Sequence, residues 1–70
     1  MIPICFLDLG EESSVKRVSG TPEVKKHLEN LGFVPGSEVS IINKIGGNLI
    51  VKVKESRVAI DESMARKIMV

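Results

Sequence analysis

One helical pattern of apolar residues stands near the middle of the chain. Val24, Leu28 and Leu31 recur at spacings of four and three residues, which places their side chains on one face of a helix. Thr21 can cap the first turn, and the proline that follows it suits the first helical position. The pattern therefore predicts a helix over residues 22–31, with its apolar face packed on a sheet.

The residues after this helix predict its end and a change of direction. Gly32 falls where a left-handed residue ends a helix, and Phe33 can then fold back on Leu28 as in a Schellman motif. Residues 34–37, Val-Pro-Gly-Ser, match a type II turn, because proline fixes φ and the next glycine accepts a positive φ. A strand is therefore expected to leave in a new direction.

Most of the remaining chain shows the two-residue alternation that is typical of strands. Leu49, Val51 and Val53 alternate with partly polar neighbours, and the glycine-rich tip Gly46-Gly47-Asn48 precedes them, which predicts a hairpin. The expected strands cover residues 15–19, 39–42, 49–54, 58–60 and 67–70, with turns at residues 10–14 and 55–56 and a helix cap at Asp61.

These elements predict a fold that is mainly β with one helix. About five short antiparallel strands joined by tight turns, without a long crossover, favour a small SH3-like barrel with the helix plugging one open side. Seventy residues can build one core, and no repeat or linker divides the chain. A single domain over residues 1–70 is therefore expected.

Composition limits the location and the partners. The chain is 43% hydrophobic and 27% charged with a net charge of +1, so neither disorder nor a strongly basic nucleic-acid surface is indicated. Its single cysteine excludes an internal disulfide framework and favours the reducing cytoplasm. The opening residues 1–7 lack the charged region of a signal peptide, and no apolar stretch reaches the roughly 20 residues that span a bilayer. Any role at a membrane is therefore expected to go through a partner.

Catalytic and metal-binding patterns are missing from the sequence. No local pair of Cys or His suits a metal, which leaves Cys5 and His27 as weakly supported candidate ligands. The favoured interpretation of Cys5 is a packed thiol, and that of His27 is a solvated or partly packed imidazole. No nucleophile elbow accompanies the lone histidine, so an enzyme is not expected. Without Trp or Tyr, base stacking is disfavoured as well, and Phe6 is the one aromatic available as an exposed anchor.

The segment from His27 to Val39, HLENLGFVPGSEV, resembles the central signature of FeoA proteins, small cytoplasmic components of bacterial ferrous iron uptake. The resemblance extends along the chain, through the strand before this segment and the hairpin arm after it. It implies an SH3-like barrel that acts with FeoB, a membrane iron transporter with a cytosolic GTPase domain, and it offers no catalytic residues. Two departures, Asn48 where many relatives have proline and Cys5-Phe6 where a polar residue is common, concern the expected partner surface.

The resulting hypothesis is an accessory or regulatory protein that docks on the transporter's cytosolic domain and has no resident cofactor beyond weakly held ferrous iron or another divalent metal. Docking is expected through the helix face and the hairpin tip, and self-association is left open. An alternative is a metal-sensing module related to the C-terminal domain of iron-dependent repressors, with Cys5 and His27 as ligands. Arg57, placed at a protruding turn, is the candidate for a cation offered to the GTPase. The candidate partner-binding residues are Lys25, Glu29, Gly47, Asn48 and Arg57.

Overall fold

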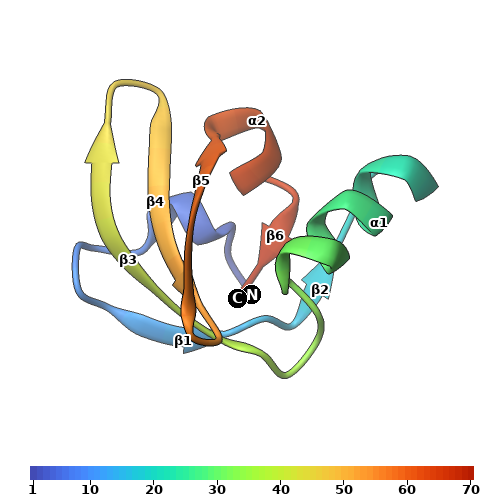
Figure 1. The fold of residues 1–70 in the computed structure, drawn as a ribbon, viewed down its shortest axis with the longest axis horizontal. Helices are drawn as coiled ribbons and strands as arrows, with labels where there is room; N and C mark the ends of the chain where they lie inside the picture. The colour runs from blue at the N-terminus through green and yellow to red at the C-terminus, as the bar shows by residue number, and fades with distance from the viewer.

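A computed structural model describes all residues from 1 to 70 and is mainly β with one long helix (Figure 1). The elements are η1 (Ile4–Phe6), β1 (Glu12–Ser14), β2 (Arg17–Val18), α1 (Pro22–Leu31), β3 (Glu38–Ile45), β4 (Asn48–Val53), β5 (Ser56–Asp61), α2 (Glu62–Ala65) and β6 (Ile68–Met69). Four strands form an antiparallel sheet in the order β1-β3-β4-β5, and β2 pairs with β6. The predicted fold class is confirmed.

The helix α1 has the predicted bounds. The Thr21 hydroxyl accepts a hydrogen bond from the Val24 N–H at 3.3 Å, which caps the first turn. At the other end the Phe33 N–H donates to the Leu28 carbonyl at 3.0 Å, and Gly32 is left-handed with φ +108°. This is the Schellman pattern that the sequence predicted, and it directs Phe33 into the core.

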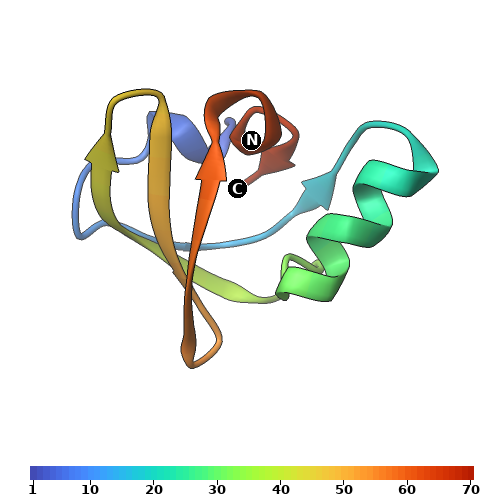
Figure 2. The ribbon, with the colours of Figure 1, turned by 45° about the horizontal axis from the view of Figure 1, so that its top comes forward.

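The position of α1 differs from the prediction. The sequence predicted that the helix plugs an open side of the barrel, and both views show α1 at the side of the molecule next to β2 (Figure 2). Only Leu28 is buried on this helix, while Val24 and Leu31 pack against the core with part of their surface exposed. A stripe of three apolar residues is too narrow to cover a sheet, so most of the helix surface stays exposed.

The segment from Glu12 to Val18 corrects the prediction of a strand over residues 15–19. It is one bent stretch that pairs first with β3 and then with β6: the Val15 N–H donates to the Ser37 carbonyl at 2.8 Å, and the next N–H, of Lys16, donates to the Met69 carbonyl at 2.7 Å. A strand that changes sheets closes a small barrel. The bend splits it into β1 and β2, so the structure has six strands where about five were expected.

The strand β4 buries every second side chain, as the sequence predicted. Leu49, Val51 and Val53 are buried on β4, and Gly46-Gly47 connect it to β3. The next turn is shifted by one residue from the prediction: Lys54 and Glu55 form it, with Lys54 left-handed at φ +57°. Arg57 therefore lies within β5, directly opposite Lys52 on β4, and not at a protruding turn.

The core is aliphatic apart from one ring. Phe33 is 1% exposed and is the largest of the fully buried side chains, and no polar residue is buried. Both chain ends join the barrel, because Ile2 and Val70 exchange backbone hydrogen bonds of 2.9 and 2.8 Å (Figure 1). The buried residues are Ile4, Leu7, Val15, Leu28, Phe33, Val39, Ile41, Leu49, Val51, Val53, Ile60, Ala65, Ile68 and Val70.

Candidate functional site

A pocket of about 170 Å³ lies where the tip of the β3–β4 hairpin meets η1 and the start of α2. Apolar and polar groups share its wall, and two of the predicted partner-binding residues, Gly47 and Asn48, belong to it. The lining residues are Cys5, Phe6, Lys44, Gly46, Gly47, Asn48, Leu49 and Glu62. We refer to this pocket and its rim as the hairpin-tip site.

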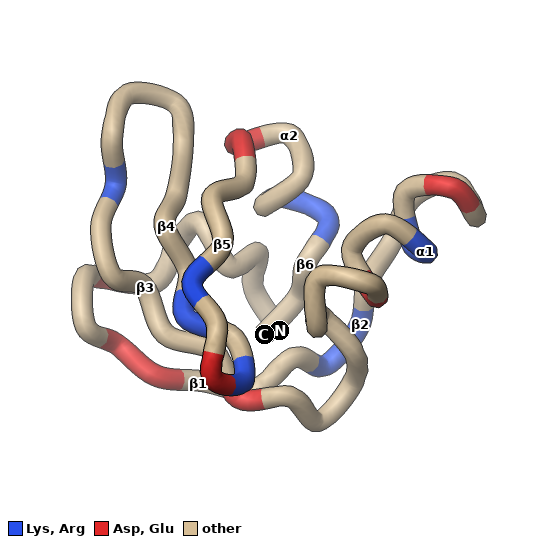
Figure 3. Tube along the Cα trace, in the orientation of Figure 1, with Lys and Arg blue, Asp and Glu red and all other residues tan.

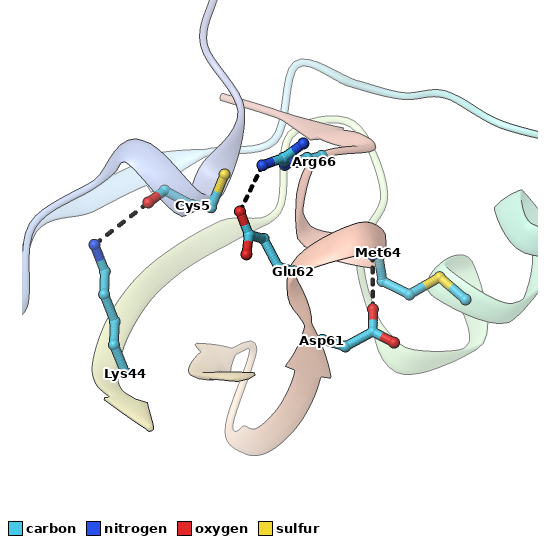
Figure 4. A network of polar contacts seen from close by, with 6 residues as sticks. All are labelled: Cys5, Lys44, Asp61, Glu62, Met64 and Arg66. Atoms are coloured by element: carbon cyan, nitrogen blue, oxygen red, sulfur yellow. Dashed lines mark hydrogen bonds and ion pairs between the residues drawn. The ribbon is translucent and has the colours of Figure 1, made fainter. Parts of the chain in front are cut away.

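Two hydrogen bonds between distant parts of the chain fix this site. The Lys44 ammonium donates to the Cys5 carbonyl at 3.3 Å and joins the hairpin to η1 (Figure 4). The Glu62 N–H donates to the Gly47 carbonyl at 2.9 Å and joins the hairpin tip to α2. Because both contacts link separate elements, the glycine-rich tip is held in place, which favours a preorganised surface.

Glu62 lines the pocket and has its ionic partner within its own segment. It forms an exposed ion pair with Arg66 at 2.7 Å, one helical turn further on (Figure 4). Exposed pairs at this spacing contribute about 0.3–0.5 kcal/mol. The pair therefore orients the rim of the site more than it stabilises the fold.

Phe6 is the residue that distinguishes this site. The turn η1 directs Ile4 and Leu7 into the core, and with this spacing the Phe6 ring lies outside, 68% exposed on the wall of the pocket. Large exposed aromatics are enriched in protein interfaces. The expected exposure of Phe6 is confirmed, and its use as an anchor stays a prediction.

The structure does not gather the predicted partner-binding residues on one surface. Lys25 and Glu29 lie exposed on α1, at the opposite side of the molecule from the hairpin tip (Figure 1). Arg57 is exposed on β5. Gly47 and Asn48 alone belong to the hairpin-tip site, and the two rim residues Lys44 and Glu62 gave no signal in the sequence.

The two candidate metal ligands also remain apart. Cys5 is partly buried in η1 and packs against the core, whereas His27 is exposed on α1. No group of three or more His, Cys, Asp and Glu side chains in the structure could hold a metal ion. No residue set is therefore assigned to a metal.

Asp61 caps the helix that borders the site. Its Oδ1 accepts the Met64 N–H at 2.8 Å and the Ser63 hydroxyl at 3.0 Å (Figure 4). These hydrogen bonds, first the one from the Met64 N–H, lower the pKa of Asp61 below its usual value, because they stabilise the carboxylate.

The lowered pKa of Asp61 predicts a pH dependence of stability. The carboxylate contributes stability above the pKa it has in the unfolded chain, and this contribution is lost as the pH falls through the lower pKa of the folded state. We expect Asp61→Asn to melt below wild type at pH 7, with the difference shrinking as the pH falls below the ordinary aspartate pKa of 3.8. Melting curves between pH 2 and 7 measure it, and a constant difference over that range would contradict the assignment.

The comparisons with known proteins agree on one family. The family model that is described as the FeoA domain matches residues 2–70. The chain belongs to the FeoA family. It is 34% identical over 70 residues to a protein of Methanocaldococcus jannaschii that carries the name Fe(2+) transport protein A, and the match covers 100% of this chain and 85% of that protein. FeoA is a family involved in Fe(2+) transport and is not known as an enzyme family.

Solved FeoA structures share the fold of this FeoA chain. The FeoA of Stenotrophomonas maltophilia, described as a procaryotic SH3 domain protein and solved with zinc, is 28% identical, with 99% of this chain and 88% of that chain covered at a TM-score of 0.86. A crystal structure of an iron uptake regulatory protein (FeoA) is 20% identical, with 96% and 91% covered at a TM-score of 0.89. The predicted SH3-like fold and the resemblance to FeoA are confirmed.

The same fold occurs in one domain of a repressor. A manganese-dependent transcriptional repressor is 17% identical, with 94% of this chain and 38% of that chain covered at a TM-score of 0.86. At this identity the likeness concerns the fold alone.

In this FeoA chain no helix is both long and apolar enough to cross a membrane.

Proposed function

We propose that this FeoA chain is a cytoplasmic accessory protein of ferrous iron uptake that docks on the cytosolic part of a FeoB-type membrane transporter and regulates it. The observation that carries the proposal is the exposed Phe6 ring beside the hairpin-tip site, in a chain that belongs to a family involved in Fe(2+) transport. The protein acts through binding and performs no catalysis of its own.

Phe6 supports docking because its ring is exposed and is not one of the buried core side chains. A phenylalanine ring that leaves water on binding removes a large apolar area, which stabilises an interface strongly. The chain has two phenylalanines, and the core uses the other one, Phe33. The exposed ring is therefore the natural anchor for a partner.

The rim of the hairpin-tip site supports a specific interface. Lys44, Asn48 and Glu62 surround the apolar part of the pocket with a cation, an amide and a carboxylate. An apolar centre with a polar rim is the usual anatomy of such interfaces. Since Lys44 and the Glu62 N–H already hold the tip in place, docking requires little ordering of the hairpin.

The metal-sensing alternative has less support. It depends on Cys5 and His27 as ligands, which lie on η1 and α1 and take part in no group of metal-binding side chains. The likeness to the manganese-dependent repressor is one of fold. Docking without a resident metal is therefore the function proposed.

The substitution Phe6→Ser tests this function. We expect it to weaken binding to the cytosolic domain of the transporter by at least about tenfold, the effect of removing a central aromatic anchor, and to leave the melting temperature near that of wild type. Titration calorimetry with the purified domain measures the affinity, and GTP turnover by that domain reports regulation.

Ile2→Ser is the matched control, because Ile2 is an exposed apolar residue at the joined termini and does not line the pocket. Its affinity should equal that of wild type. Equal affinities for wild type and Phe6→Ser would contradict docking at the hairpin-tip site, and no binding by wild type at any concentration would contradict the proposed function.

A further inference from the structure

One long edge of the main sheet is unpaired. The strand β5 pairs with β4 and with no other strand, and it ends the order β1-β3-β4-β5 (Figures 1 and 2). The residues 56–60 take part in no backbone hydrogen bond outside this pairing, while Asp61 caps α2. A strand edge of this length is a template for another strand.

The register determines which peptide groups of β5 point outward. The two-residue turn pairs Val53 with Ser56, and in such hairpins the pair that closes the turn exchanges both hydrogen bonds. The pattern then alternates along the strand, so the N–H and C=O groups of Arg57 and Ala59 point away from β4. The same alternation on β3 directs Ile41 away from β4, and the Ile41 carbonyl does accept the Gly10 N–H on that side, at 2.7 Å.

The side chains along this edge are symmetric about Ala59. Two residues before it stands Arg57, and two residues after it stands Asp61, with all three on one face of the strand. On the other face Val58 and Ile60 flank the same centre. A second β5 laid antiparallel with Ala59 opposite Ala59 therefore brings each arginine opposite an aspartate and each valine opposite an isoleucine.

The charges on this face favour such a partner. Arg57 stands directly opposite Lys52, a like-charge pair that costs stability, and blue segments meet on β4 and β5 in Figure 3. The one ion pair of the structure joins Arg66 to Glu62, so neither Lys52 nor Arg57 is neutralised within the chain. Asp61 uses Oδ1 for its cap, which leaves Oδ2 for an arginine from outside.

We propose that β5 is the interface of a homodimer in which two copies of this chain pair their edges antiparallel about a two-fold axis at Ala59. The two Ala59 residues exchange backbone hydrogen bonds, and Arg57 of each copy forms an ion pair with Asp61 of the other. The four-stranded sheets join into one continuous sheet. This inference does not rest on the transporter, because it uses β5 and not the hairpin-tip site.

Charged residues on a sheet edge usually prevent pairing. They do so when the arriving strand places a like charge, or no partner, beside them. Here the spacing of Arg57 and Asp61 about Ala59 makes the arriving charge opposite in sign, so a copy of the same strand is attracted. The small Ala59 side chains at the centre leave the two backbones room to approach.

Sedimentation measurements over a range of protein concentrations test the dimer. We expect a concentration-dependent dimer that weakens as salt is added, and Arg57→Glu should weaken it by about tenfold, because both ion pairs become like-charge contacts. Arg17→Glu is the matched control: it makes the same change of net charge on an exposed residue of β2, which is paired with β6, and it should dimerise like wild type.

Amide hydrogen exchange gives a second readout that does not depend on a variant. The Ala59 N–H should become protected as the protein concentration rises, because it gains an acceptor in the dimer. A chain that stays monomeric at millimolar concentration, a dimer weakened equally by Arg57→Glu and Arg17→Glu, or an Ala59 exchange rate that does not depend on concentration would each overturn the proposal.

Discussion

Phe33→Ala is expected to lower the free energy of unfolding by about 3–5 kcal/mol, the range for removing a buried phenylalanine ring. Phe33 is 1% exposed and is the largest fully buried side chain, so its loss leaves a cavity in a core of small aliphatic residues. For a domain of this size the melting temperature should fall by on the order of 20 °C, or the chain should fail to fold.

The same substitution at Phe6 provides the control. Phe6→Ala removes the same atoms from a side chain that is largely in water and should change the free energy of unfolding by no more than about 0.5 kcal/mol. Denaturant unfolding of both variants measures the contrast. Similar losses of unfolding free energy in Phe6→Ala and Phe33→Ala would contradict the placement of Phe6 on the surface and Phe33 in the core.

Gly32→Val should destabilise the fold by about 3 kcal/mol or more. Gly32 has φ +108°, where a β-branched residue is strained by about 1–3 kcal/mol, and a Cβ there would lie 3.3 Å from Cγ2 of the buried Val53. Strain and close contact add up at this position, because the glycine both ends α1 and lies against β4.

Gly36→Val separates the two causes. Gly36 has φ +91° but no atom within 4 Å of the position of a Cβ, so it should show the strain alone, about 1–3 kcal/mol. Thermal melts of both variants measure the difference. Equal losses would contradict the contact with Val53, and two variants that melt like wild type would contradict the left-handed conformations.

The sequence predicted the elements that have strong local signals. The helix α1 has its cap and its glycine end where expected, and the alternation of Leu49, Val51 and Val53 identified the central strand. These signals work because each is contained in a few neighbouring residues. The family, and with it the SH3-like fold, was indicated by the segment from His27 to Val39.

The errors of the prediction have physical causes outside local sequence. The strand β1 is polar and half-exposed at the edge of its sheet, so it lacks alternation and was taken for a turn. Lys54 occupies a left-handed turn position without being a typical turn residue, which shifted the predicted turn and misplaced Arg57. The position of α1 beside the barrel depends on packing between distant segments.

The candidate site was predicted in part. Gly47 and Asn48 were identified as a hairpin tip, and Phe6 as an exposed aromatic. That these residues form one site depends on the Lys44–Cys5 hydrogen bond, whose partners are 39 residues apart in the chain. No local pattern could have indicated that contact or separated the site from Lys25 and Glu29 on α1.

Docking at the hairpin-tip site is tested most directly by amide chemical shifts of the labelled chain, recorded while the transporter's cytosolic domain is added. The account predicts saturable shifts centred on Phe6, Gly47 and Asn48, with Lys25 and Glu29 unchanged. Shifts confined to α1, or a spectrum that does not change at a saturating concentration of the domain, would contradict it.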